Sequence, residues 1–406
     1  MTFPPPSAAA QPGRRLVVIG AGVLGVCLTA RLAEAAGPGV AVTLLEQARP
    51  GHAATRSSFA WLNANNKTPR AYHDLNHAGL RAWSALAGAG AQDRPDWYRP
   101  SGNLEWADTP QAAAELTARA GRLADWGYPA HLISPAAAAE LEPALRLPPT
   151  VTAVAWFPEE GYLLTEPMVA DLAGRAARAG ATVLSGEPGR VTGVDVAGGA
   201  VRAVRTATGQ VIPADVVVCC AGRWVPELAA LAGSAASIPL VPWALPGAEA
   251  PGLVVLAGPV TAAAAGRGGP ARMVHSPGVH FRPHGGGQVH LEAPDVHADL
   301  HTGEPALGDL ATELLARARA VASGLDTAEV TGYRVCVRPM PADGHSIVGW
   351  LPAPGGLYVA VTHSGVTLGA HLAELMASEL LAGADRAELA PYRPGRFPAA
   401  PSPAPS

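Results

Sequence analysis

The sequence predicts an α/β fold with two domains. One is a Rossmann-like dinucleotide-binding domain built from discontinuous segments, and the other is an α+β domain rich in antiparallel sheet. Three observations support this prediction: a glycine cluster lies between an apolar strand and a helix near the start, strand-and-helix units return near the end, and residues 238–333 form short β-like runs instead. The 406 residues are enough for two packed cores.

The first unit of the expected nucleotide-binding sheet ends at Glu46. Leu16–Ile19 is a short apolar run, and Val23–Ala36 has helical periodicity that Gly37-Pro38-Gly39 ends. Val40–Leu45 is a second apolar run, which leads directly to Glu46. A strand, a tight turn, a helix and a second strand in this order begin a doubly wound sheet.

The middle of the chain adds further elements to this sheet. We expect three helices, over Tyr72–Ala87, Pro110–Trp126 and Glu166–Arg178. They are followed by a strand over Ala181–Leu184, a hairpin or meander over Val191–Asp215 that turns at Gly198-Gly199, and a strand over Val216–Cys220. Thr165 is expected to be the N-cap of the third helix, because a hydroxyl there can accept a hydrogen bond from the first turn.

The pattern then changes and returns. Where the pattern changes, we expect strands over Leu253–Leu256, His280–Arg282 and Val289–Glu292, the last two paired across Gly285-Gly286-Gly287, and one helix near Leu310–Ala322. Where the nucleotide-binding pattern returns, we expect a strand over Tyr358–Val361 and a long helix over Gly365–Leu381. We therefore expect the nucleotide-binding domain to comprise 14–95, 160–237 and 335–390, the second domain 96–159 and 238–334, and flexible tails 1–13 and 397–406.

Composition excludes several classes of protein. Hydrophobic residues are 49% and charged residues 15%, as in a compact enzyme, and the net charge of −4 argues against a nucleic-acid binder. Pro, Gly or charge interrupts every apolar run, so we expect no membrane span. Residues 1–15 are rich in Pro and Ala, so we expect no secretory signal there. Cys219 and Cys220 are adjacent and Cys27 lies in a helix, which predicts no disulfides and a reducing, cytoplasmic setting.

The glycine cluster Gly20-Ala21-Gly22-Val23-Leu24-Gly25 has the context of a dinucleotide site. Gly20 allows the sharp turn, Gly22 lets the backbone approach a pyrophosphate, and Gly25 lets the helix and strand pack closely. The helix N-terminus offers N–H groups to the phosphates. Glu46 can accept hydrogen bonds from a ribose diol.

Four further segments, in order, resemble the D-amino-acid oxidase superfamily, which includes glycine oxidase, sarcosine oxidase and D-amino-acid dehydrogenase. They are the small-residue loop Gly51–Ser58, the strand and turn Asp215–Trp224, Arg338-Pro339-Met340-Pro341-Ala342-Asp343-Gly344, and His363–Leu368. The resemblance implies FAD as the cofactor, with contacts from Gln47, Thr55, Arg56, Ser57, Ser58, Val191, Ala221, Gly222, Trp224, Gly365, Val366, Thr367 and Leu368.

The resemblance also implies a reaction. Family members oxidise an amino acid or related amine by deamination or dealkylation, moving a hydride from the carbon next to nitrogen to flavin N5, and then pass electrons to oxygen or another acceptor. Arg338 matches the arginine that binds the substrate carboxylate, with a structural arginine paired to Asp343 as the alternative. His363 is expected beside the flavin, as a substrate or flavin contact or as a structural histidine. Glycine oxidases carry an arginine near that position, which this chain lacks.

Other functions stay open at this point. A nicotinamide-dependent dehydrogenase would share the glycine cluster, a flavin monooxygenase would consume NAD(P)H, and a redox-silent nucleotide-binding protein would not react. Cys336 resembles in place the flavin-linking cysteine of sarcosine oxidases, and His52 the linking histidine of dimethylglycine-oxidising relatives, although neither link is the favoured reading.

Two other groups of residues are candidates for the site. The segment Phe59–Asn66 either lines the substrate side or only fixes a loop through its amides. The histidines His275, His280, His284, His290, His297 and His301 invite a metal site, but most lack carboxylates at ligand spacing, so no metal is expected.

Overall fold

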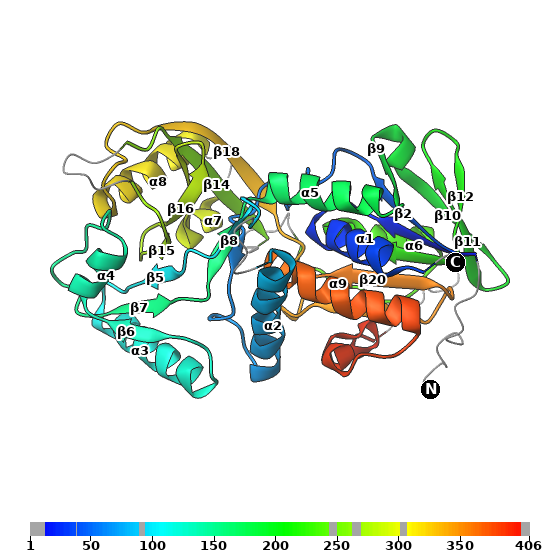
Figure 1. Cartoon of the computed structure of the whole chain (residues 1–406), viewed down its shortest axis with the longest axis horizontal. Helices are drawn as coiled ribbons and strands as arrows, with labels where there is room; N and C mark the ends of the chain where they lie inside the picture. The colour runs from blue at the N-terminus through cyan, green and yellow to red at the C-terminus, as the bar shows by residue number, and fades with distance from the viewer. Residues whose placement is uncertain are drawn as a thin grey trace, which may run out of the picture.

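The computed structural model describes residues 13–37, 39–88, 94–242, 250–261, 269–300 and 307–398. Apart from residues 13, 397 and 398, the two expected tails lie outside these ranges, and so does His301. Two large sheets lie at opposite ends of the long axis of the molecule, and helix α2 (Arg70–Leu86) stands between them (Figure 1). Within the described residues, no helix is long and apolar enough to cross a membrane.

The first large sheet is the nucleotide-binding type that the sequence predicts. Its strand order is β19-β20-β13-β1-β2-β9, and all neighbours are parallel except β19 and β20. The strands are β1 (Arg14–Ile19), β2 (Val40–Glu46), β9 (Thr182–Ser185), β13 (Val216–Cys219), β19 (Ile347–Trp350) and β20 (Leu357–Val361).

Both faces of this sheet are covered, which is why its strands are almost wholly apolar. Leu16 and Val18 of β1 belong to a core shared with helices α1 (Val23–Ala35), α5 (Thr165–Arg178) and α9 (Gly365–Ala382). The alternate β1 residues face a second core formed with α6 (Val225–Leu231) and the meander β10 (Val191–Ala197), β11 (Ala200–Thr206) and β12 (Val211–Pro213).

The second large sheet is mostly antiparallel, with the order β18-β14-β17-β16-β15-β5-β7-β6. Its strands are β5 (Asn103–Glu105), β6 (His131–Ile133), β7 (Val154–Phe157), β14 (Pro251–Gly258), β15 (Met273–His275), β16 (His280–Gly285), β17 (Gln288–Glu292) and β18 (Glu329–Val337). Helix α8 (Leu307–Val321) packs on β14, β17 and β18. The other helices of this half are α3 (Pro110–Asp125), α4 (Pro135–Leu141) and α7 (Pro294–Asp299).

A small sheet links the two halves. Strand β8 (Gly161–Leu163) pairs with β3 (Trp61–Leu62) on one side and with β4 (Tyr98–Arg99) on the other. Because β3 follows the first nucleotide-binding unit in the chain, this sheet brings residues 59–67 to the boundary between the halves.

Two details of the sequence prediction are wrong. Thr165 is the first residue of α5 and not its N-cap; Leu164 is the N-cap, and no side chain caps the helix. Residues 238–333 contain α7 as well as α8, whereas one helix was expected. Helix α7 has six residues, too few for a periodic pattern, and begins at a proline, whose fixed φ suits the first turn.

Candidate active site

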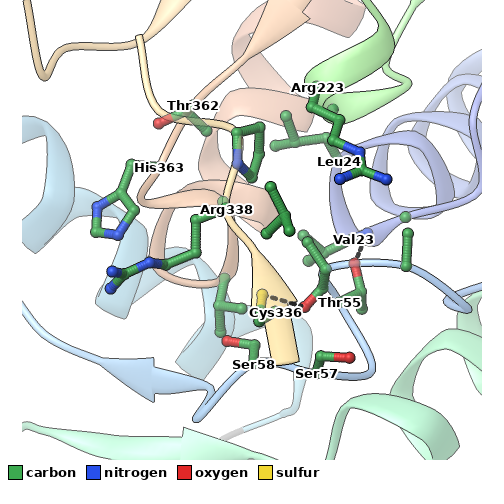
Figure 2. Close-up of a pocket in the computed structure, with 18 of the residues that line it drawn as sticks. Val23, Leu24, Thr55, Ser57, Ser58, Arg223, Cys336, Arg338, Thr362 and His363 are labelled. Carbon is green, nitrogen blue, oxygen red and sulfur yellow. Dashed lines mark hydrogen bonds between the residues drawn. The ribbon is translucent and has the colours of Figure 1, made fainter. Parts of the chain in front are cut away.

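A cavity of about 1760 Å³ opens where the carboxyl ends of β1, β2 and β13 approach the end of β18 (Figure 2). This is where ligands bind in open α/β sheets, because the turns after adjacent strands leave a crevice there. The cavity is larger than a typical drug-sized pocket, so it has room for a dinucleotide and a second small molecule.

The glycine turn forms one end of this cavity. Gly20 has φ +100°, and a Cβ there would lie 2.7 Å from Ala221 Cα. A Cβ on Gly25 would lie 1.8 Å from the Gly20 carbonyl oxygen, so only glycine lets α1 pack this close to the turn. Gly20, Gly22, Val23 and Leu24 line the cavity, and Ala21 and Gly25 support the turn from behind.

Glu46 lies beside this turn because β1 and β2 are parallel, with Ile19 opposite Leu45. Its carboxylate accepts hydrogen bonds from the Ala21 N–H at 2.8 Å and from the Ala48 N–H at 3.0 Å. A carboxylate offers about four acceptor positions, so Glu46 can still accept hydrogen bonds from a ligand in the cavity.

The loop after β2 folds back over the start of α1. The Val23 N–H donates a hydrogen bond of 3.0 Å to Thr55 Oγ1, shown in Figure 2, and the Gly51 N–H donates one of 2.8 Å to the Ala21 carbonyl. Arg56 forms an ion pair of 2.8 Å with Glu166 of α5. The expected loop contacts Gln47, Thr55, Arg56, Ser57 and Ser58, together with His52, all line the cavity.

Most of the other expected cofactor residues line the same cavity. They are Val191, Ala221, Gly222, Trp224, Gly365, Val366 and Thr367. Leu368 is the exception, because it is fully buried in the core of the helix layer. The start of α9 therefore opens on the cavity, and the partial positive charge of a helix N-terminus is available there.

Arg338 and His363 lie side by side on the opposite wall (Figure 2). Arg338 donates long hydrogen bonds of 3.3 Å to the carbonyls of Ala250 and Pro251. Asp343, the alternative partner that the sequence offers for Arg338, instead forms an ion pair of 2.8 Å with Arg396.

The His363 side chain is exposed to the open cavity, but the protein around it shields it from bulk water and this desolvation lowers its pKa to about 3. The positive charges of Lys67 and Arg338 act in the same direction. The imidazole is therefore neutral at neutral pH. Lys67 itself lines the cavity, and burial lowers its pKa to about 8 against the opposing effect of Glu160.

The segment Phe59–Asn66 lies on the cavity wall, and one of its amides fixes the loop from behind. Phe59, Ala60, Trp61, Asn63 and Asn66 line the cavity, while Asn65 is buried and donates a hydrogen bond of 3.2 Å to Glu160. Ala60 has φ +60°, an uncommon conformation for a residue with a side chain. Such strain tends to occur near functional sites, which fits the position of Ala60 on the cavity wall.

Several residues that line the cavity are not assigned to the active site by the sequence, and Lys67, His280, Glu292 and His297 are the ionisable ones considered below. Lys67 directly follows the Phe59–Asn66 segment, which was the available signal for it. For Glu292, the alternation of residues along its strand predicts which face of the sheet the side chain lies on. It does not predict which other part of the chain packs against that face.

The histidine group divides between two places. His280 and His297 line the cavity, whereas His275 and His290 are buried in the second sheet and His284 packs on His290. Within the described ranges, no three His, Cys, Asp or Glu side chains gather as a metal site would require.

Cys336, on β18, also lines the cavity but is 5% exposed. Its thiol donates to the Ala54 carbonyl at 3.7 Å, and burial raises its pKa to about 11. A thiol with so high a pKa forms little thiolate at neutral pH and is a poor nucleophile.

Comparisons with known proteins agree with this geometry. The family model described as "FAD dependent oxidoreductase" matches residues 15–379. Among curated proteins, the mitochondrial pyruvate dehydrogenase phosphatase regulatory subunit of Mus musculus is 27% identical over 226 residues, which is 56% of this chain and 25% of that protein. The chain thus spans about a quarter of the length of this relative.

Solved structures with the same fold include three enzymes of amino acids or amines. Glycine oxidase from Geobacillus kaustophilus superposes with a TM-score of 0.76 at 23% identity, covering 95% of this chain and 100% of that one. Iminodiacetate oxidase from Chelativorans sp. BNC1 gives 0.73 at 22%, covering 94% and 99%. L-amino acid deaminase from Proteus vulgaris gives 0.74 at 15%, covering 98% and 100%. At these identities the likeness establishes the fold.

Proposed function

Because this chain belongs to the family of FAD-dependent oxidoreductases, as its motifs predict, we propose that it oxidises the carbon–nitrogen bond of a carboxylate-bearing amino acid or related amine. One observation carries the proposal. The cavity has a dinucleotide site at one end, with the glycine turn and Glu46, and Arg338 beside a neutral His363 at the other.

The residues present fit FAD. Gly20 and Gly22 line the cavity at the N-terminus of α1, whose N–H groups suit a pyrophosphate, and Glu46 keeps acceptor capacity for a ribose. The positive end of α9 opens on the same cavity, at the place where family members put the flavin ring. When bound, FAD supplies the acceptor for the two electrons and the hydrogen that leave the substrate carbon.

The chain's own residues then have the task of holding and orienting the substrate. The planar guanidinium of Arg338 can bind a carboxylate at two points, which fixes which hydrogen of the substrate faces the cofactor. Phe59 and Trp61 present aromatic surface to the cavity and limit the access of water. His363, being neutral, can share a hydrogen bond with the substrate without adding a charge.

The proposal includes a division of the chain into two domains. We propose that residues 14–95, 160–237 and 335–390 bind FAD, and that 96–159 and 238–334 supply the substrate wall, with the boundary inside β18. The electrons then pass to oxygen or another acceptor. The four cysteines are free, which supports a reducing compartment such as the cytoplasm as part of this proposal.

An anaerobic screen tests the proposal. The FAD-loaded protein is mixed with both enantiomers of the amino acids and with N-methylated amines, and the loss of flavin absorbance is followed. We expect reduction by at least one carboxylate-bearing amine, and no consumption of NADH or NADPH. A flavin that only NAD(P)H reduces would point to a monooxygenase, and a flavin that none of these compounds reduces would point to a redox-silent protein.

A further inference from the structure

Beside Arg338 the cavity carries a second group of ionisable side chains, His280, Glu292 and His297, which we call the Glu292 cluster. All three belong to the second sheet and its helix α7, and all three line the cavity together with Arg338. The reaction proposed above uses none of them. These three side chains therefore need a separate explanation.

The cluster is held in place by consecutive elements of the chain. His280 of β16 and Glu292 of β17 are opposite each other in the antiparallel pair, so their side chains lie on one face. His280 Nδ1 lies 3.4 Å from Glu292 Oε1. Helix α7 follows β17 directly and brings His297 over Gly252, where a Cβ would lie 3.2 Å from the imidazole ring. The absence of a side chain at Gly252 makes room for His297.

Glu292 supplies a negative charge to this part of the cavity. Burial acts to raise its pKa, but the hydrogen bond with His280 and the nearby His297 and Arg338 outweigh that effect, so the pKa is lowered and the group is a carboxylate. Burial lowers the pKa of His297, which is neutral at neutral pH. Among the described residues, Glu292 makes its side-chain hydrogen bond with His280, which leaves acceptor positions towards the cavity.

The Glu292 carboxylate near Arg338 disfavours the binding of a substrate whose only charged group is its own carboxylate. Arg338 and Glu292 are close enough to act on each other electrostatically, so an incoming carboxylate is attracted by one and repelled by the other. The reacting amine cannot be the partner of Glu292 either. A carboxylate beside it would stabilise the ammonium form, whereas hydride loss requires the neutral amine. The compensating charge must therefore come from another part of the substrate.

We propose that the Glu292 cluster binds a second, cationic group of the substrate, so that the preferred substrates are amino acids with a basic side chain. Arg338 then holds the carboxylate and Glu292 holds the distal ammonium or guanidinium, with His280 and His297 as hydrogen-bonding neighbours. This inference rests on the proposed function, because it assigns the substrate class of the same site.

A binding experiment tests this without any turnover. Hexanoate and 6-aminohexanoate have the same chain length and differ in the terminal ammonium, and neither carries an amine next to the carboxylate. Each is titrated into the FAD-loaded protein, and binding is followed by the change in flavin absorbance and by calorimetry. We expect 6-aminohexanoate to bind about tenfold to a hundredfold more tightly, as a charge-assisted contact in a site shielded from water would give.

Glu292→Gln should remove that preference and leave hexanoate binding equal or tighter, since the repulsion is gone. Glu329→Gln is the matched control, because Glu329 is an exposed acid at the far end of β18. The comparison of the two ligands on the unaltered protein needs no variant, so a Glu292 variant that fails to fold does not affect it. In the anaerobic assay, lysine should likewise reduce the flavin at lower concentration than norleucine.

The outcomes separate this inference from the function on which it rests. Equal binding of the two acids to the unaltered protein, with flavin reduction by neutral amino acids, would overturn the basic subsite and keep the amine-oxidising function. Binding of neither acid would overturn the basic subsite together with the carboxylate site at Arg338. A preference for 6-aminohexanoate that persists in Glu292→Gln would overturn the role of Glu292.

Discussion

The indole N–H of Trp61 donates a hydrogen bond of 2.9 Å to the carboxyl group of Glu160. Trp61 lines the cavity, whereas Glu160 is fully buried behind it. Asn65 and Asn103 donate to the same oxygen at 3.2 and 3.0 Å, and the Tyr128 hydroxyl donates to the other at 2.7 Å. The wall of the cavity is thus held from behind by one buried acid.

This acid should make stability depend on pH. Burial raises the pKa of Glu160 from 4.5 to about 8, against the effect of its hydrogen bonds. Between these two values the folded protein keeps a proton that the unfolded chain has released, so the free energy of unfolding falls as pH rises, by up to about 1.4 kcal/mol per pH unit. Glu160→Gln should lose this slope. Urea unfolding from pH 5 to 8 measures it, and equal slopes in both proteins would contradict the assignment.

Glu46 should control FAD affinity. Glu46→Ala removes the acceptor for the ribose and also the hydrogen bond that holds the Ala21 N–H. We therefore expect the free energy of FAD binding to become less favourable by about 1.5–3 kcal/mol. Glu46→Gln keeps one acceptor oxygen and should lose less. Fluorescence titration of the apoprotein with FAD gives the dissociation constants. An unchanged affinity for FAD in Glu46→Ala would show that Glu46 does not contribute to cofactor binding.

Arg338→Ala should weaken transition-state binding of a carboxylate substrate by about 2–5 kcal/mol, because the desolvated carboxylate loses its charged partner. Arg338→Lys should recover only part of this, since an ammonium cannot make the planar two-point contact. Arg146→Ala is the control, because Arg146 is exposed and pairs with Asp326. The readout is the rate of anaerobic flavin reduction at equal FAD content. A variant that retains the original rate would make Arg338 a structural residue.

Lys67→Met should raise the pKa of His363, because the Lys67 charge is one of the causes that lower it. The value should remain below 6.5, since desolvation is the larger cause and persists in the variant. Lys67→Arg keeps the charge and should leave the pKa low. NMR titration of selectively labelled histidines measures this shift. An unaltered pKa in Lys67→Met would mean that the two side chains do not interact across the cavity.

The flavin should be released when the protein is precipitated with acid. Cys336 is buried and its pKa is raised to about 11, so its thiolate is scarce, and we expect no covalent link there or at His52. The absorbance of the supernatant decides this. If flavin stays in the pellet, Cys336→Ala and His52→Ala would identify the residue that holds it.

The sequence alone determined the parts of the molecule that depend on contiguous residues. Strand β1, the glycine turn, α1 and β2 follow one another directly, and the contact that requires glycine at Gly25 is with Gly20, five residues earlier. The β16–β17 hairpin is equally local, since its turn and both strands lie within residues 280–292. In such units, residue spacing fixes which atoms meet.

The tertiary structure decided the pairing of residues that are distant in sequence. Asp343 could have balanced Arg338 nearby in the chain, but packing of the C-terminal segment brings Arg396 to it instead. Thr165 has the side chain of an N-cap, yet it lies inside the first turn of α5 and is buried. Local preference is weak compared with the burial of an apolar face, so tertiary packing overrides it.

The active site shows the same division. The sequence determined Arg338 and His363 as candidates through their motifs. Glu292 lies on a strand that the sequence predicts and Lys67 directly follows the Phe59–Asn66 segment, but neither pattern says that these side chains meet Arg338 and His363. Strand alternation predicts which side chains share a face, and it does not say which other segment that face will meet. Only the docking of the two sheets decided that these four side chains share one cavity, because that docking depends on contacts summed over both cores.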